Sequence, residues 1–297
     1  QYPTSPPHNA PEHFNGRRRP IPHTENNPYV NAFWKWWPTL YKNLKHFRMT
    51  GGEPLMDKNT YKVLEYIINN PKPDLHLNVT SNMCPPNKKL KDKYFDMIKR
   101  ICLDEAVEHM MQFVSVDAYG KKAEYIRHGL DFNYMLDNVD EFLERIPVRN
   151  SITFIITYNN LSVTSLEDLL RDIRLLREKH SKTYQRIWFD IPLLRQPVWQ
   201  QITLLPESYQ EIHKANIEYM REFSGEEEGF GGFKDFEIQK MLRNLAYWRI
   251  NANNNTQNKK NFYAFFNEHD RRRETNFQNT FPEMEEFWME CKALWQN

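Results

Sequence analysis

The stretch His46-Phe47-Arg48-Met49-Thr50-Gly51-Gly52-Glu53-Pro54 decides how the chain is interpreted. The chain has only nine glycines, and two of them are adjacent here, between a short strand candidate and a helix candidate. Glycines at this place allow positive φ and a close approach of a ligand to the backbone. Free amides at the start of the next helix suit a carboxylate or phosphate, whereas Glu53 suits an ammonium group. Taken alone, the stretch is either a structural turn or a ligand-binding corner.

Around this turn, strand and helix patterns alternate at least five times. Strands are expected at 46–50, 75–80, 110–116, 151–158 and 186–191, and helices at 57–69, 90–101, 132–146 and 165–180. This order predicts an α/β fold whose parallel sheet has helical crossovers, either doubly wound or a (β/α) barrel. In both architectures, functional groups lie at the carboxyl ends of the strands. Polar residues gather at these predicted ends: Glu53, Ser81, Asn82, Ser115, Asp117, Thr157, Asn159 and Asp190.

The flanking segments differ from this repeating unit. Residues 1–29 hold seven of the eighteen prolines and are expected to be an irregular lead-in. A helix is predicted at 33–44, and the barrel portion is expected to span 30–204. Beyond it, 205–297 is predicted to be a mainly helical extension, with helices at 207–223 and 236–248, a polar, Asn-rich loop at 251–260 and a helical cap at 262–295.

Composition narrows the class of protein. Of the 297 residues, 40% are hydrophobic, which is near the usual fraction for a globular protein. The formal net charge of +1 gives no electrostatic case for binding nucleic acid or a membrane surface. No run has the length of a membrane span and the first residues do not resemble a signal peptide, so a cytoplasmic protein is expected. The three cysteines, Cys84, Cys102 and Cys291, form neither a disulfide framework nor a zinc pattern.

Placed in order, the strand-end motifs resemble those of the radical S-adenosylmethionine superfamily over roughly residues 30–200. Thr50-Gly51-Gly52-Glu53-Pro54-Leu55 is similar to the end of that family's second strand, and Val79-Thr80-Ser81-Asn82 to the end of its third. Val114-Ser115-Val116-Asp117-Ala118, then Arg127 before Gly129, and Phe189-Asp190-Ile191-Pro192 resemble the fourth-strand, Arg-Gly and sixth-strand elements. The segments 124–132 and 266–273 further resemble twitch domain-containing radical SAM proteins.

This resemblance implies a partial TIM-like barrel, S-adenosyl-L-methionine and a [4Fe–4S] cluster as cofactors, and hydrogen abstraction from a substrate of unknown class: peptide, nucleotide or sugar. It implies an electron donor such as flavodoxin or ferredoxin. The turn would hold the cofactor's amino group, Ser115 and Asp117 its ribose or carboxylate, and Arg127 its carboxylate. The full set of cofactor-binding residues that it implies is Gly51, Gly52, Glu53, Pro54, Thr80, Ser81, Asn82, Ser115, Asp117, Arg127, Asp190 and Ile191.

The sequence departs from the family at one essential place. The cluster is bound through Cys-x3-Cys-x2-Cys after the first strand, and no such array occurs in these residues. We expect the cluster loop and the first strand to lie upstream of Gln1. The alternative is a non-catalytic relative that keeps the barrel and binds a ligand or a partner.

Other interpretations compete for individual residues. Arg127 could instead form a surface ion pair with Glu124, three residues before it. Ser115 and Asp117 could cap a helix. Cys84 is expected to be an inert buried thiol rather than a group that faces the cofactor, and 269–273 is expected to be a charged surface rather than a phosphate site. A third possible function is that of a hydrolase that uses Glu53, Asp117 and Asp190. The sequence shows no metal-ligand spacing that would support it.

Overall fold

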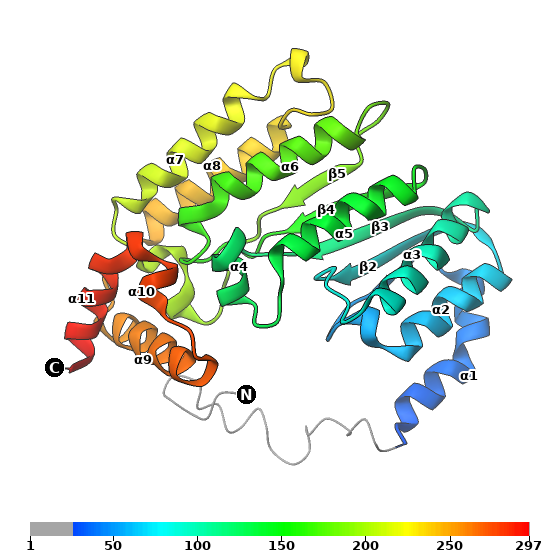
Figure 1. Ribbon diagram of the computed structural model, residues 1–297, viewed down its shortest axis with the longest axis horizontal. Coiled ribbons are helices and arrows are strands. Elements are labelled where there is room, and N and C mark those ends of the chain that lie inside the picture. The colour runs from blue at the N-terminus through cyan, green and yellow to red at the C-terminus, as the bar shows by residue number, and fades with distance from the viewer. Residues whose placement is uncertain (1–25, 297) are drawn as a thin grey trace.

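The computed structural model describes residues 26–296, and it places five strands in one parallel sheet (Figure 1). In sheet order, which is also chain order, these are β1 (His46–Met49), β2 (Lys72–Ser81), β3 (Val107–Ser115), β4 (Asn150–Ile155) and β5 (Ile187–Asp190). The predicted α/β class is therefore confirmed, and every predicted strand is present. Within the described residues, β1 and β5 are the two edge strands of this sheet.

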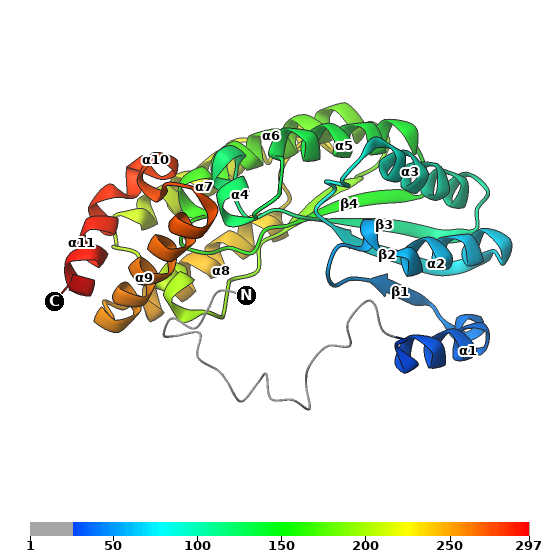
Figure 2. The ribbon, with the colours of Figure 1, turned by 60° about the horizontal axis from the view of Figure 1, so that its bottom comes forward.

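The helices between the strands lie against one face of the sheet. They are α2 (Lys58–Asn69), α3 (Lys88–Leu103), the short α4 (Gly120–Ile126), α5 (Phe132–Arg145) and α6 (Leu166–His180). Figure 2 shows α3, α5 and α6 side by side along that face. Because parallel crossovers are right-handed, an unreversed strand order keeps successive helices on the same side. Among residues 26–296 the sheet is thus singly wound, and the reversal of strand order that a doubly wound sheet needs does not occur between these five strands.

The two faces of the sheet differ in burial. On β2, Leu75, Leu77 and Val79 are fully buried, while the residues between them are partly exposed. The buried set faces the helices, because Gln112, which pairs with Val79 in register, accepts a hydrogen bond from Tyr94 of α3 at 2.6 Å. The opposite face, here called the inner face, carries His76, Asn78 and Thr80 on β2.

At one edge of the sheet, α1 (Pro28–Asn43) covers β1. Its first turn is capped by the Asn27 side chain, which accepts from the amides of residues 29 and 30, and Pro28 suits the first helical position. The buried Trp37 ring lies 4.9 Å from the ring of Phe47 in β1. The helix begins five residues before its predicted start at Phe33. Of the predicted lead-in, residues 1–25 lie outside the described part of the chain.

The C-terminal region is helical, as predicted. It consists of α7 (Tyr209–Glu222), α8 (Asp235–Asn251), α9 (Thr256–Arg273), α10 (Phe277–Thr280) and α11 (Glu285–Gln296). Short 3-10 turns connect elements along the chain: η3 (Pro54–Met56), η4 (Val163–Ser165), η5 (Val198–Gln200), η6 (Ile202–Leu204), η7 (Glu226–Glu228) and η8 (Pro282–Met284). The edge strand β5 contacts α8, where the rings of Trp188 and Phe236 lie 5.9 Å apart.

Two local predictions were wrong. The Asn-rich segment 251–260 is not a loop, because only 252–255 separate α8 from α9. Asn255 instead caps α9 by accepting from the amide of Asn258 at 2.9 Å, so its polarity marks a helix start. The helix α4 was not predicted. Within residues 26–296, no helix is both long enough and apolar enough to cross a bilayer.

Candidate functional site

The glycine turn after β1 uses backbone conformations that suit glycine. Gly51 has φ +94° and Gly52 has φ +56°, and both residues are exposed. A Cβ atom at either position would meet nothing within 4 Å. The glycines are therefore required by the path of the backbone rather than by close packing. Pro54 is buried and begins η3, which leads into α2.

The Glu53 carboxylate joins the turn after β1 to the end of β2. It accepts from Ser81 Oγ at 2.7 Å, from the Asn82 amide at 3.0 Å and from the Leu55 amide at 3.1 Å. A carboxylate offers about four lone-pair positions, so about one remains for a further donor. The structure thus brings together three of the predicted residues, and the Glu53 carboxylate is half-buried.

The remaining β2 residues are engaged locally. The Asn82 side chain accepts from the amide of Cys84 at 2.9 Å and so stabilises the turn after the strand. Thr80 faces the inner side, and its hydroxyl accepts from Arg48 Nε and Nη2 at 3.2 and 3.1 Å. Arg48 was not among the predicted site residues.

Asp117 and Arg127 bind each other. Asp117 Oδ2 lies 2.8 Å from Arg127 Nε, and Oδ1 accepts from the Thr157 amide at 2.9 Å. The alternative, a surface ion pair between Arg127 and Glu124, does not form among the described residues. Glu124 instead pairs with Lys121 and accepts from the Phe132 amide. A ligand carboxylate would therefore share the guanidinium with Asp117.

Ser115 is the last residue of β3 and faces the inner side, half-buried. Neither Ser115 nor Asp117 caps α4, because its N-cap residue is Tyr119, whose own side chain makes no capping hydrogen bond and whose amide donates to Ser165 Oγ at 3.1 Å. The capping alternative for these two residues is therefore wrong.

The end of β5 is attached to α8. The Asp190 carboxylate pairs with Lys240, and the carbonyl of the buried Ile191 accepts from Asn244 Nδ2 at 3.1 Å. Thus four strand ends carry predicted residues at one edge of the sheet. Lys240 joins them without having been predicted, and Thr157 joins them as a residue that was expected at a strand end but not among the cofactor-binding residues.

The cysteines lie on separate elements. Cys84 is half-buried, its Sγ donates to the carbonyl of Asp131 at 3.2 Å, and burial raises its pKa to about 11. Burial also raises the pKa of both Cys102 and Cys291 to about 12. Within residues 26–296, no three His, Cys, Asp or Glu side chains are grouped so that they could hold a metal ion. The cysteines present therefore do not fit the ligand set of an iron–sulfur cluster.

The basic segment at the end of α9 is a charged helix surface. Arg271 and Arg272 both contact the Glu268 carboxylate, and His269 is buried. Arg271 and Arg272 agree with the predicted charged surface because both have a carboxylate partner, whereas the buried His269 does not belong to such a surface.

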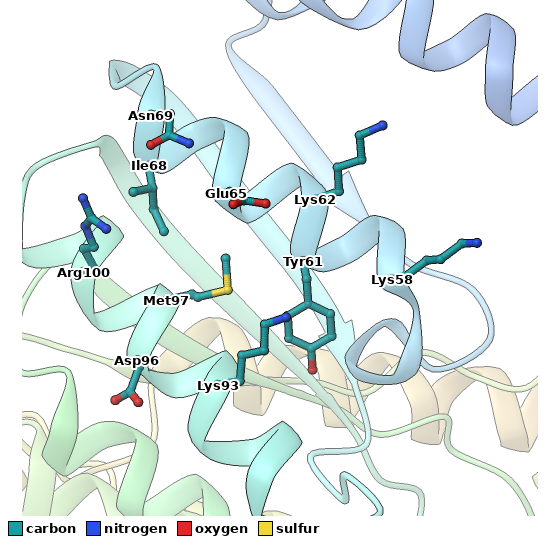
Figure 3. Close-up of a pocket in the computed structure, with 10 residues that line it drawn as sticks. All are labelled: Lys58, Tyr61, Lys62, Glu65, Ile68, Asn69, Lys93, Asp96, Met97 and Arg100. Carbon is teal, nitrogen blue, oxygen red and sulfur yellow. The ribbon is translucent and has the colours of Figure 1, made fainter.

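Two hollows help to locate the site. One of about 210 Å³ opens beside β1, and its lining includes Arg48, Thr50, Gly51 and Pro54. A larger one of about 520 Å³ lies between α2 and α3 on the outer helical layer (Figure 3). There Lys58 and Lys62 point away from the hollow. The smaller hollow is the one that adjoins the glycine turn.

Comparisons of the chain with protein-family models, with curated proteins and with solved structures found no match.

Proposed function

We propose that the carboxyl edge of the sheet binds S-adenosyl-L-methionine and that the chain is part of a radical S-adenosylmethionine enzyme. The observation that carries the proposal is the Glu53 carboxylate at the glycine turn. Ser81 and Asn82 fix it, and it retains about one acceptor position that suits the cofactor's ammonium group.

The proposal includes a fold, a partial (β/α) barrel, and the strand order supports it. Singly wound parallel strands curve in one sense because each twists relative to the last. In the proposed barrel, β1 to β5 are the second to sixth strands, and a first strand would pair with β1 at the edge that no other strand of residues 26–296 occupies. The helical C-terminal region, from α7 onward, would cap the barrel beside β5.

The roles of the other residues follow from their positions. Ser115, half-buried on the inner face, would bond the ribose. Arg127 would contact both Asp117 and the cofactor carboxylate. Its Nε lies against Asp117, and the guanidinium also has Nη1 and Nη2, which could donate to the cofactor. The backbone around Asp190 and Ile191 would face the adenine.

A [4Fe–4S] cluster would supply the electron that cleaves the cofactor and generates the hydrogen-abstracting radical. The described cysteines do not fit its ligands, so no step of that chemistry is assigned to this chain's residues. The same observation favours the second candidate, a barrel that binds S-adenosylmethionine or a similar ligand without catalysis. Glu53, Asp117 and Asp190, which a hydrolase would use, do not gather as a metal site among residues 26–296.

The binding proposal is tested by equilibrium dialysis of the chain against S-adenosylmethionine. Glu53→Gln removes the charge and should weaken binding by roughly 10- to 150-fold, because a charge-assisted hydrogen bond contributes ~1.5–3 kcal/mol. Glu65→Gln, an exposed change on α2, is the matched control and should bind like the parent chain. Equal binding by the two variants, or none by the parent, would refute the site.

The enzyme and the non-catalytic alternative are separated by the coding sequence upstream of Gln1 and by reconstitution of the protein that it encodes. A Cys-x3-Cys-x2-Cys array, with 5′-deoxyadenosine released after anaerobic addition of iron, sulfide and reductant, supports the enzyme. A full-length protein that binds S-adenosylmethionine but takes up no cluster supports the alternative.

A further inference from the structure

Arg48 is held in one place on the inner face of the sheet. It is exposed and lies on β1, opposite Asn78 and, across β2, Met111. Its guanidinium carbon lies 4.2 Å from the centre of the Phe113 ring, and Nε and Nη2 both donate to Thr80 Oγ1. Thr80 and Phe113 are one inward position further along their strands. The side chain therefore leans toward the carboxyl edge of the sheet and the glycine turn.

This cation has no anionic partner among residues 26–296. No ion pair joins Arg48 to an Asp or Glu side chain in this part of the chain, whereas Arg127, Arg145 and Arg177 each have at least one. Its contacts are a hydroxyl and a ring face, and neither neutralises its charge. Stacking on an aromatic ring fixes the guanidinium plane and leaves its outer N–H groups able to donate.

The surrounding inner face favours an anion. From His46 toward the carboxyl ends, the inward positions on β1 to β3 contain no carboxylate: His46, Arg48, His76, Asn78, Thr80, His109, Met111, Phe113 and Ser115. Arg48 also lines the hollow of about 210 Å³ beside β1, but that hollow includes Asp57 and residues of α1 and α2, so the inner face rather than the hollow is where an anion would lie. On the inner face, a ligand anion beside Arg48 would meet a cation and no carboxylate from an inward position of β1, β2 or β3.

We propose that Arg48 binds the carboxylate or phosphate of a ligand at this corner of the inner face. A planar guanidinium pairs with either anion through two parallel hydrogen bonds. The ligand anion is either the carboxylate of the cofactor proposed above or a group on the second substrate. The proposal does not depend on the assignment of Glu53, because an anion alone would occupy the site.

The test follows the Arg48 Nε–H resonance of the ¹⁵N-labelled chain, identified as the signal that Arg48→Lys removes. The probes are inorganic phosphate, acetate, S-adenosylmethionine and its decarboxylated analogue. A saturable shift with phosphate or acetate is expected, and Arg48→Gln should weaken binding of that probe by about tenfold, as measured by calorimetry. A shift with S-adenosylmethionine but not with its decarboxylated analogue would assign the anion to the cofactor. Saturation by phosphate without that difference would assign it to the second substrate.

Arg195 provides the matched control. It is an exposed arginine whose guanidinium carbon lies 4.7 Å from the centre of the Tyr247 ring, outside the inner face of β1 to β3. Its Nε–H signal should not shift, and Arg195→Gln should bind the probes like the parent chain. The proposal is overturned if no probe saturates, or if the Arg195 signal shifts in parallel with that of Arg48. Loss of S-adenosylmethionine binding in Glu53→Gln with phosphate binding intact would separate this site from the one at Glu53.

Discussion

At the scale of single residues, a buried histidine shows how one side chain couples stability to pH. His213 is fully buried on α7, with Nδ1 2.7 Å from the Tyr158 hydroxyl and Nε2 2.9 Å from the carbonyl of Met241. These partners fix the neutral tautomer, with the proton on Nε2. Desolvation lowers the pKa of His213 from 6.5 to about 4.

This shift predicts a loss of stability on acidification. Between pH 6.5 and about 4, the unfolded chain binds a proton at His213 that the folded chain does not, so stability falls as pH falls through this window. The loss from this group is about 3 kcal/mol, since one pKa unit corresponds to ~1.4 kcal/mol. Urea unfolding at pH 7 and pH 4.5 should show that His213→Gln is less stable at pH 7 but loses less on acidification. The same pH dependence in both proteins would contradict the assignment.

The positions of some candidate residues, though not their roles, could be predicted from the geometry of parallel strands. Glu53, Ser81 and Asn82 were expected to meet because their strands end at the same edge, and the structure joins them directly. The pairing of Asp117 with Arg127 could not be predicted, because it depends on where α4 ends. Arg48 was missed because four residues of strand do not show which face its side chain occupies.

At the scale of elements, one ion pair fastens α6 to α8. Arg177 and Glu237 side chains are both fully buried, and Nη2 lies 2.6 Å from Oε1. The guanidinium also donates to the carbonyls of Ile187 at 3.0 Å and Gly232 at 3.2 Å. The pair thus connects the helical layer, β5 and the C-terminal region.

Removing one partner should leave the other charge buried and unpaired. Arg177→Met is expected to lower the free energy of unfolding by about 3–5 kcal/mol, measured by urea titration. Arg171→Met, one and a half turns earlier on α6, breaks an exposed pair with Glu167 and should cost less than ~1 kcal/mol. The double variant Arg177→Met with Glu237→Met should be more stable than Arg177→Met alone. If it is not, the buried charge is not the source of the loss.

The elements were predictable to the extent that local pattern determines them. Buried strands and amphipathic helices alternate along residues 46–190, and this alternation identified the sheet and its crossovers. The loop predicted at 251–260 was wrong because asparagine is typical both of loops and of helix caps. Only the presence of a helix after Asn255 distinguishes the two. The helix α4 was not predicted because it is short and buries only Ala123 and Tyr125, too few residues to give a helical pattern.

At the scale of the whole molecule, the sheet is secured more firmly at its centre than at β1. Every residue of β4 but the last is buried, and β4 pairs on both sides. In β1 only Met49 is buried, and β1 pairs with β2 alone among the described strands. Ring contacts at this edge include Trp37 with Phe47, 4.9 Å apart, and His46 stacked on His76, 4.7 Å apart.

Hydrogen exchange followed by mass spectrometry should therefore separate the two strands. Backbone amides of β1 are expected to exchange through local opening with little dependence on urea, and those of β4 through global unfolding with a steep dependence. Equal protection of the two strands would mean that α1 protects the amides of β1 as well as a paired strand would.

A longer chain that contains the proposed first barrel strand provides the decisive comparison. Pairing with β1 should raise the protection of β1 and leave that of β4 unchanged, because only the edge gains hydrogen bonds. Unchanged protection of β1 in such a chain would argue against the partial barrel and leave the singly wound sheet as the complete architecture.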